Sequence, residues 1–250
     1  MLPALFVSHG APTMPFENIP AREFLKGLGA SLERPRGIVI ATAHWETAAP
    51  AVARMAVNST IHDFHGFPPA LYQLRYPAPG DAALSDRVAQ LTGAAIDTAR
   101  GLDHGAWVPL LLMYPAHDIP VVQIAVQPQR GVAHHMALGR ALAPLRAEGV
   151  LVMGSGSFVH NLRRLDRRGP DAPEPDWSRA FSQWMDDAIS RRDDEALIEY
   201  RRRAPFAVEA HPEDEHLLPL FVAYGAGGAA TRLHSSHTYG SLRLDAYGFA

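Results

Sequence analysis

Residues 37–45 read GIVIATAHW, an apolar and β-branched run that ends beside a histidine. The run lacks the alternation of apolar and polar residues that marks a half-exposed strand. Continuous runs of this kind are typical of strands buried on both faces of a mostly parallel sheet. Three further runs have the same character, at 5–7 (LFV), 119–126 (IPVVQIAV) and 149–153 (GVLVM), and a weaker strand is expected at 94–96.

Helical stretches separate these strands. We expect helices at about 81–91, 106–113, 131–147, 176–199 and 213–224, with Asp81 capping the first and Asp176 the fourth. Strands that alternate with helices predict an α/β fold with a mostly parallel central sheet flanked by helices. The loop at 169–175 is too short to separate two domains and no internal repeat is present, so residues 1–250 are expected to form a single domain.

The composition excludes several classes of protein. With 250 residues, 47% hydrophobic and 20% charged, the chain can bury a full core, which excludes a disordered or fibrous protein. A net charge of −3 gives no field that would recruit nucleic acid or an anionic membrane. The chain has no cysteine, which excludes disulfides, a cysteine nucleophile and thiolate metal sites.

The chain also carries no clear targeting signal. No apolar run approaches the roughly 18 residues of a membrane span, and no basic segment with a cleavage site is recognisable near residue 1. We therefore expect a soluble, cytoplasmic protein with no nucleic-acid or membrane partner, either a monomer or a homodimer.

Histidines stand where an α/β fold places its ligands. His9 directly follows the first strand, His44 follows the second, His160 comes seven residues after the fourth, and His104 follows the weaker strand at 94–96. In open α/β sheets, ligands bind outside the carboxyl ends of the strands. Histidine is the commonest metal ligand and transfers protons near neutral pH. A single loop histidine is more often structural, but four at strand ends together predict a metal site.

The other histidines divide into candidates and structural residues. His216 ends the stretch HPEDEH at 211–216 and could complete the site, although acidic residues there also favour a helix start. His62 and His65 could hold a metal at an i, i+3 spacing, or could belong to a loop over a pocket. His134 and His135 are expected on the surface, and His117 is expected to be structural. His234 and His237 are expected at the edge of the pocket.

Other catalytic motifs are absent. Residues 154–158 read GSGSF, which differs from the nucleophile elbow G-x-S-x-G at its last position. Val159 stands where a dinucleotide-binding G-x-G-x-x-G needs glycine. The chain has neither a Walker A lysine nor an H-E-x-x-H motif.

Seven stretches in one order resemble the 4,5-DOPA extradiol dioxygenase family, a branch of the LigB-like (class III) ring-opening dioxygenases. They cover nearly the whole chain, and together they are far more specific than any one alone. The stretches are SHGAP (8–12), TAHW (42–45), IHDF with GFP (61–68), YPAPG (76–80), LDHGAW (102–107), GSG through VHNL (154–162) and EHLLPL (215–220).

The resemblance implies one LigB-like catalytic domain with a three-layer architecture and a mononuclear non-haem metal. Fe(II) is expected for activity, and Zn(II) is plausible as the bound metal. The matching positions imply His9, His44 and His216 as ligands, and His160 as a fourth ligand or as an acid/base. Some LigB relatives have a glutamate where this chain has His216, and an all-histidine site carries less negative charge, which weakens discrimination against zinc.

The resemblance also implies the reaction. The chain is expected to be an extradiol dioxygenase that inserts both atoms of O2 into a catechol such as L-DOPA. His160 is expected to accept a catechol proton, and His104 to return a proton as the ring opens. Asp103 either fixes a histidine tautomer or caps the helix at 106–113. A zinc-dependent hydrolase and a non-catalytic metal-binding protein of the same fold remain alternatives that use the same histidines.

Overall fold

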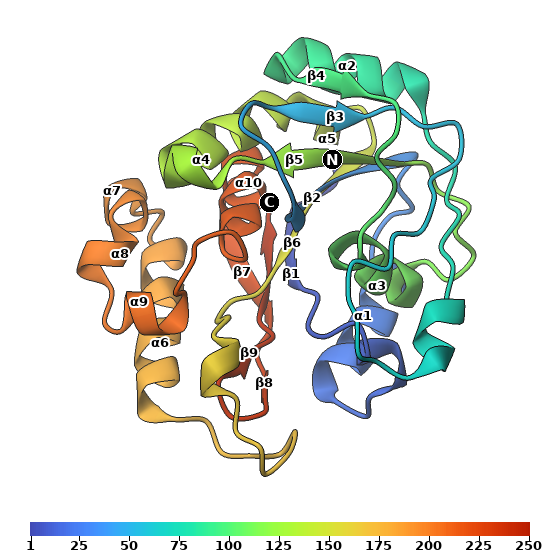
Figure 1. Cartoon of the computed structure of the whole chain (residues 1–250). Coiled ribbons are helices and arrows are strands. Elements are labelled where there is room, and N and C mark those ends of the chain that lie inside the picture. Colours follow the sequence, from blue (N-terminus) through green and yellow to red (C-terminus); the bar gives the residue numbers. More distant parts are fainter.

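An eight-stranded sheet runs through the centre of the computed structural model, which describes residues 1–250 (Figure 1). The strands lie in the order β4-β3-β5-β2-β6-β1-β10-β7. Their bounds are β1 Ala4–Ser8, β2 Gly37–Glu46, β3 Ala51–Ala53, β4 Ala95–Asp97, β5 Val121–Val126, β6 Val150–Gly156, β7 Ala230–His234 and β10 Ala246–Phe249. A separate two-stranded sheet pairs β8 (His237–Thr238) with β9 (Leu242–Arg243).

The middle of the large sheet is parallel. β2 pairs in parallel with both β5 and β6, and β6 pairs in parallel with β1. Antiparallel pairs occur toward the two edges, where β3 meets β5 and where β10 joins β1 to β7. Every residue of β1, β5 and β6 is buried. The expected α/β fold with a mostly parallel sheet, covered on both faces, is confirmed.

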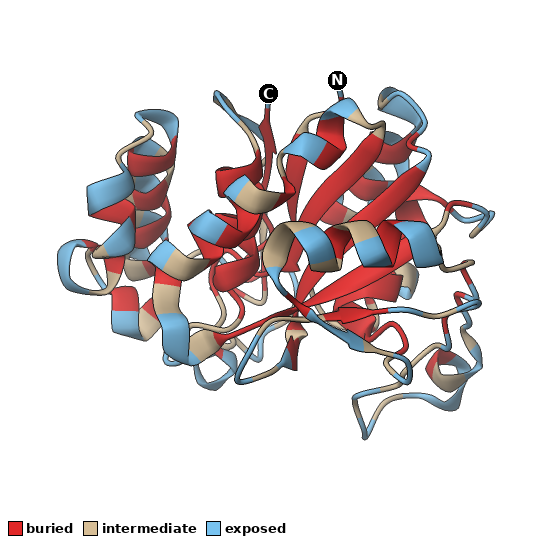
Figure 2. Ribbon diagram, turned by 90° about the horizontal axis from the view of Figure 1, so that it is seen from above, coloured by how far each residue is buried: buried red, intermediate tan, exposed pale blue.

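Helices cover both faces of the sheet. Alternate strand residues belong to two different hydrophobic clusters: Phe6 and Val39 pack with α2, α4 and α10, whereas Leu5 and Ile38 pack with α1 and α3. Figure 2 shows the buried strands enclosed between helices whose outer sides are exposed. The α-helices are α1 Pro20–Ser31, α2 Ala82–Thr92, α3 His104–Met113, α4 Gly131–Leu142, α5 Pro144–Ala147, α6 Asp176–Ser190, α7 Asp194–Ile198, α8 Tyr200–Arg203, α9 Ala207–Ala210 and α10 Leu218–Ala226.

The sequence placed most elements within a few residues and missed some helix ends. Asp81 caps α2 as expected, since its side chain accepts a hydrogen bond from the Leu84 N–H. The expected Asp176 cap is wrong: Pro175 is the N-cap of α6, and Asp176 is the first helical residue. The helix expected at 176–199 is broken because Arg192 has a positive φ of 55° and Asp193 caps a new helix, α7.

The last predicted helix also starts later than expected. The stretch at 213–217 forms turns, and α10 begins at Leu218 with proline in its first turn, a favoured place for that residue. His216 therefore lies in the turn before the helix and not on it. No helix in the structure combines the length and apolar character needed to cross a membrane. The two ends of the chain lie close together (Figures 1 and 2), because β1 pairs with β10 from Ala4 to Phe249.

Candidate metal centre

Five histidines meet at the carboxyl edge of the parallel strands. His9 follows β1, His44 lies near the end of β2, His104 opens α3, His160 follows β6 and His216 precedes α10. The Nε2 atoms of His9 and His44 are 3.1 Å apart, and one nitrogen of His104 completes a group within 4.8 Å. A second group within 4.8 Å joins His160, Glu215 and His216. The His216 ring centroid is 4.9 Å from that of His44, so the two groups adjoin.

The hydrogen bonds of His9 free one of its nitrogens for a ligand. The Ser155 hydroxyl donates to the Gly105 carbonyl at 2.5 Å, and a hydroxyl has only one hydrogen to give. Ser155 Oγ must therefore accept from His9 Nδ1, which lies 3.1 Å away. With the hydrogen on Nδ1, the neutral ring has its lone pair on Nε2, which is the atom that faces His44.

Two carboxylates fix further histidines in the same way. Asp63 accepts from His104 Nδ1 at 2.9 Å and from the His104 backbone N–H at 3.0 Å. Glu215 accepts from His216 Nδ1 at 2.8 Å. A carboxylate behind an imidazole sets its tautomer and makes the opposite nitrogen a better ligand or base. Neither carboxylate was predicted from the sequence to support a histidine, although Asp63 lies in the IHDF stretch and Glu215 in the EHLLPL stretch.

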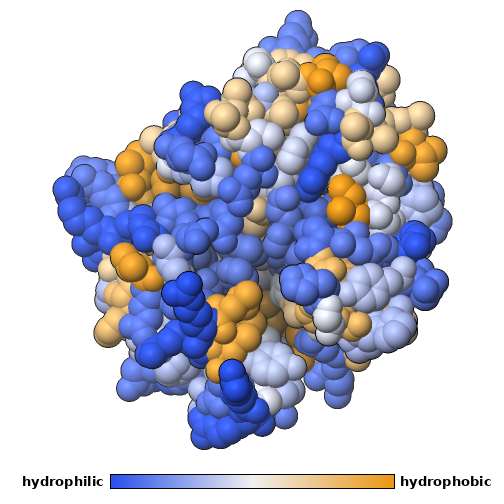
Figure 3. All heavy atoms as spheres, viewed as in Figure 1, coloured by the Kyte–Doolittle hydropathy of each residue, from blue (hydrophilic) through white to orange (hydrophobic).

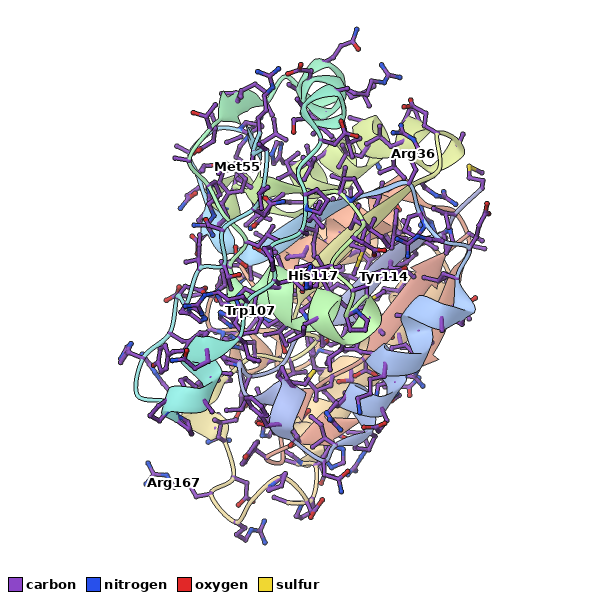
Figure 4. The ribbon with its side chains drawn as sticks, turned by 90° about the vertical axis from the view of Figure 1, so that its right-hand side faces the viewer. Arg36, Met55, Trp107, Tyr114, His117 and Arg167 are labelled. Atoms are coloured by element: carbon purple, nitrogen blue, oxygen red, sulfur yellow. The ribbon has the colours of Figure 1, made fainter.

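The loop that carries Asp63 is tied to α3. The indole N–H of Trp107, on that helix, donates to the Ile61 carbonyl at 2.9 Å. Trp107 lies where α3 faces this loop (Figure 4), and its side chain is fully buried. The carboxylate of Asp63 also lies 3.6 Å from His44 Nδ1. A single anchored side chain therefore stands behind two of the histidines.

Burial disfavours the charged form of four of the five histidines. Burial, together with the neighbouring histidines, lowers the pKa of His9 and of His216 far below the ordinary 6.5. Burial and then the charge of His104 lower the pKa of His44 to about 4, and burial followed by His211 and His104 lowers that of His160 to about 3. Neutral imidazole is the form that binds metals.

His160 differs from the other four. Its ring stacks on that of His216, with centroids 3.5 Å apart and planes 14° apart, and no group of the protein hydrogen-bonds to its ring nitrogens. Its backbone N–H donates to the Ala210 carbonyl at 3.0 Å. His160 is thus held by stacking and by its backbone, while its ring is left free to contact a ligand.

The donor set fits a borderline transition-metal ion. Imidazole nitrogens suit Fe(II) and Zn(II), whereas Mg²⁺ and Ca²⁺ prefer oxygen. The Nε2 atoms of His9 and His44 face each other at 3.1 Å, and the lone pair on His9 Nε2 points toward His44, so the two nitrogens can share a partner. A metal ion supplies such a partner, so the residues present fit the metal that the sequence predicted.

Asp103 serves the fold of the site and not a histidine tautomer. It is fully buried, caps α3 by accepting from the Ala106 N–H at 3.2 Å, and accepts from Arg100 at 2.6 Å and from Thr42 at 2.9 Å. No histidine donates to it, so the tautomer-fixing role expected for Asp103 is corrected to Asp63. The Arg100 guanidinium also donates to the His44 carbonyl at 3.0 Å, which links this network to the end of β2.

A glycine allows α3 to approach β2 closely at this point. A Cβ atom on Gly105 would lie 2.9 Å from His44 Cδ2 and 3.1 Å from Asp103 Oδ1. Both contacts are too short for a carbon atom in a packed interior. The glycine in the LDHGAW stretch therefore lets His104 and His44 lie side by side, with ring centroids 4.0 Å apart.

Several other histidine expectations are corrected. His62 and His65 join neither metal-binding group; instead, their loop places Phe64 and Phe67 on the cavity wall. His135 is fully buried, where a surface position was expected, because its ring bridges the Gly131 carbonyl and the Gln127 N–H. The expected pocket-edge residues do not line the cavity: His234, which stacks on Phe24, and His237, which lies in β8.

A cavity of about 520 Å³ opens onto the five histidines. Hydrophobic atoms gather beside a recess in the lower half of the molecule (Figure 3), where Figure 1 places β8 and β9. The histidines form one end of the cavity, and the rest of its wall consists mainly of apolar residues and backbone. The other lining residues are Gly10, Ala11, Pro12, Thr13, Glu17, Phe64, Phe67, Ser157, Leu162, Leu165, Tyr239, Leu242 and Leu244.

The chain is similar to known proteins over nearly its whole length. Residues 3–249 match the family described as the catalytic LigB subunit of aromatic ring-opening dioxygenase. The chain is 41% identical to the 4,5-DOPA dioxygenase extradiol of Beta vulgaris, covering 98% of this chain and 95% of the relative. It is 40% identical to the protein of that name from Escherichia coli K12, covering 90% and 85%. The crystal structure of an uncharacterised E. coli K12 protein superposes with a TM-score of 0.82 at 32% identity, over 100% of both chains.

Proposed function

The chain belongs to the family of the catalytic LigB subunit of aromatic ring-opening dioxygenases, and from this premise we propose that its substrate is a catechol related to L-DOPA, opened at an extradiol position. The enzyme is an extradiol dioxygenase, an oxidoreductase that consumes O2. One observation carries the proposal: five histidines form one end of a cavity of about 520 Å³ whose remaining wall is mainly apolar. A flat aromatic ring with two adjacent hydroxyl groups matches both parts of that wall.

His9, His44 and His216 are the ligands that we propose for a single metal ion. All three belong to the histidine cluster, and the hydrogen bonds of His9 and His216 leave Nε2 unprotonated. The ion is Fe(II) in the active enzyme, and the same nitrogens accept Zn(II). When bound, the ion supplies a Lewis-acidic centre at which a catechol and O2 are brought together.

Two histidines are proposed to move protons. His160 lines the cavity and its ring nitrogens have no hydrogen-bond partner in the protein, so one of them is free to accept a catechol proton. His104 Nδ1 donates to the Asp63 carboxylate, which fixes the orientation of the ring and leaves Nε2 as its second nitrogen. We assign the return of a proton to the opened ring to His104 Nε2.

The remaining wall positions the substrate and excludes water. Phe64, Phe67, Leu242 and Leu244 line the cavity together with the histidines. Apolar walls favour burial of the aromatic ring and strengthen the hydrogen bonds that its hydroxyl groups make. The ring is thereby held with its hydroxyl groups toward the histidines.

Three broader assignments rest on the sequence. Residues 1–250 are proposed as one catalytic domain, which is supported by a sheet whose strands extend from Ala4 to Phe249. A cytoplasmic location, without nucleic-acid or membrane partners, stays a prediction. The choice between monomer and homodimer also stays open.

The test is oxygen uptake by protein that has been stripped of metal and reloaded anaerobically with Fe(II). Catechols, L-DOPA among them, should give a coloured ring-opened product with matching oxygen consumption, and the Zn(II)-loaded protein should consume none. His44→Ala should abolish uptake. His65→Ala is the matched control, since His65 is exposed and outside the cavity, and it should retain activity.

The outcomes separate the alternatives. No uptake from protein shown to hold stoichiometric iron would contradict the proposal. Ester or amide hydrolysis by the Zn(II)-loaded protein, lost in His44→Ala, would favour the zinc hydrolase. Metal binding without either activity would favour a non-catalytic role.

A further inference from the structure

One carboxylate stands on the wall of the catalytic cavity. Glu17 is the only acidic residue among the lining residues, and no lysine or arginine lines the cavity. Its side chain is half-buried and forms no ion pair with any group of the protein. Apart from the histidines, Glu17 is therefore the one acidic or basic side chain that a substrate meets on the cavity wall.

The segment after β1 brings Glu17 to the wall. Gly10, with a φ of +62°, turns the chain after His9, and a short 3₁₀ helix at Met14–Phe16 precedes Glu17. The Glu17 N–H donates to the Met14 carbonyl at 3.1 Å, and the Thr13 hydroxyl donates to the Glu17 carboxylate. The carboxylate is thus held in place before a ligand arrives, which lowers the entropy lost on binding.

Positive charges nearby are directed elsewhere. The arginine-rich loop at 163–168 adjoins the cavity through Leu165 but borders a separate open hollow. Arg164 pairs with Glu209 at 2.5 Å, and Arg168 pairs with Asp166 at 2.5 Å. Arg167 points away from the body of the protein (Figure 4). A carboxylate on a bound substrate would find no cation on the cavity wall, whereas an ammonium group would find Glu17.

We propose that Glu17 recognises a cationic amino group of the substrate, so that the preferred catechols carry an ammonium group on a short side chain. This inference rests on the proposed function and assigns one residue to substrate selection. An ion pair inside a partly enclosed apolar cavity is screened less than one on the surface. Glu17 and the histidines line the same cavity, so one small molecule could contact both.

The test compares three catechols that differ in the charge of one side chain. Dopamine carries an ammonium group, 4-ethylcatechol is uncharged, and 3-(3,4-dihydroxyphenyl)propanoate carries a carboxylate. The wild-type Fe(II) enzyme should prefer them in that order by kcat/KM. Glu17→Gln should lower kcat/KM for dopamine about tenfold, mainly through KM, and leave 4-ethylcatechol within about twofold. Glu17→Lys should reverse the preference toward the propanoate.

The control is Glu33→Gln, because Glu33 is exposed and does not line the cavity. It should leave all three catechols unchanged. An equal loss for dopamine and 4-ethylcatechol in Glu17→Gln would overturn the inference, and so would a wild-type preference for the propanoate. Turnover of 4-ethylcatechol by Glu17→Gln shows that the variant is folded.

A binding measurement separates this inference from the proposed function. Calorimetry with phenethylamine and with 3-phenylpropanoate uses probes that contain no catechol. Tighter binding of the amine, lost in Glu17→Gln, would support Glu17 even if no catechol were opened. Equal binding of the two probes would overturn the inference even if catechols were opened.

Discussion

Replacing Asp63 by asparagine tests whether the carboxylate behind His104 and His44 stabilises the protein and supports its activity. Asp63→Asn removes one negative charge from behind His104 and His44 while keeping the size of the side chain. Burial alone would raise the pKa of Asp63, but the hydrogen bonds from the His104 side chain and backbone, with the charges of His104 and His44, lower it from 3.8 to about 2. Asp63 therefore ionises more readily in the folded protein than in the unfolded chain.

The size of the effect follows from that difference in pKa. A pKa shift of one unit corresponds to about 1.4 kcal/mol. The shift of Asp63 from 3.8 to about 2 therefore means that its ionised form stabilises the fold by about 2 kcal/mol at neutral pH. The value is an upper estimate because the side chain is 22% exposed. Since the pKa is lower in the folded state, the stabilisation is complete above about pH 4 and declines as the pH falls toward 2. The loss of stability in Asp63→Asn should be about half as large at pH 3 as at pH 7.

Two assays measure the consequences. Urea unfolding of the metal-free proteins at pH 7 and pH 3 gives the difference in the free energy of unfolding. Oxygen uptake by the Fe(II)-loaded variant should fall about 10- to 100-fold, as expected for a residue that supports an active-site histidine. The matched control is Asp118→Asn, because Asp118 is an exposed aspartate whose pKa is also lowered, chiefly by its hydrogen bond with Arg34. If both variants changed stability and uptake equally, Asp63 would have no special role and the reasoning would fail.

The remaining predictions probe the other parts of the site. His160→Ala should keep stoichiometric metal by elemental analysis and lose about 100-fold or more in oxygen uptake; loss of the metal would instead make His160 a ligand. Ser155→Ala removes the acceptor of His9 Nδ1–H and should weaken metal affinity about 10- to 100-fold in a chelator competition; unchanged affinity would mean that the ring is oriented by packing alone. Glu215→Gln should likewise weaken metal binding, and it should change the ratio of the Fe(II) and Zn(II) affinities in the same competition, because it removes the carboxylate behind His216. The metal-free protein should lose stability as the pH falls from about 6.5 toward 4, because burial lowers the pKa of His44 and His211 to about 4. Each histidine that is protonated only on unfolding lowers the free energy of unfolding by about 1.4 kcal/mol per pH unit. A free energy of unfolding that does not change with pH in urea titrations would contradict the burial of these rings in the neutral form.

Strand positions and the meeting of the histidines followed from sequence pattern. Buried parallel strands need continuous apolar runs, and their carboxyl ends must share one edge, so His9 and His44 had to lie close together. Helix ends were less predictable. Arg192 adopts a positive φ, which arginine rarely takes, and no local residue pattern predicted that the helix would end there.

The supporting residues could not be predicted because they depend on contacts between distant segments. Ser155 and Gly105 are 50 residues apart, and Asp63 and His104 are 41 apart. Spacing along the chain made Asp103 the nearest carboxylate to His104, yet an aspartate immediately before a helix caps its N-terminus and points along the helix axis. Glu17 was missed for a similar reason, because its position in the cavity depends on the turn at Gly10 and on Thr13.

The hydrogen bonds behind the ring nitrogens explain how an all-histidine site can carry enough negative charge for a divalent metal. A carboxylate ligand would contribute charge directly, and this chain has His216 instead. Glu215 hydrogen-bonds to His216 Nδ1, and its second oxygen is buried without a partner. Asp63 supplies another charge behind His104. Because hydrogen-bonded carboxylates make imidazoles more basic, these two residues transmit charge to the site through the rings. Substituting either one should therefore change which metal the histidines hold most tightly, whereas substituting the apolar wall should change only which catechol fits.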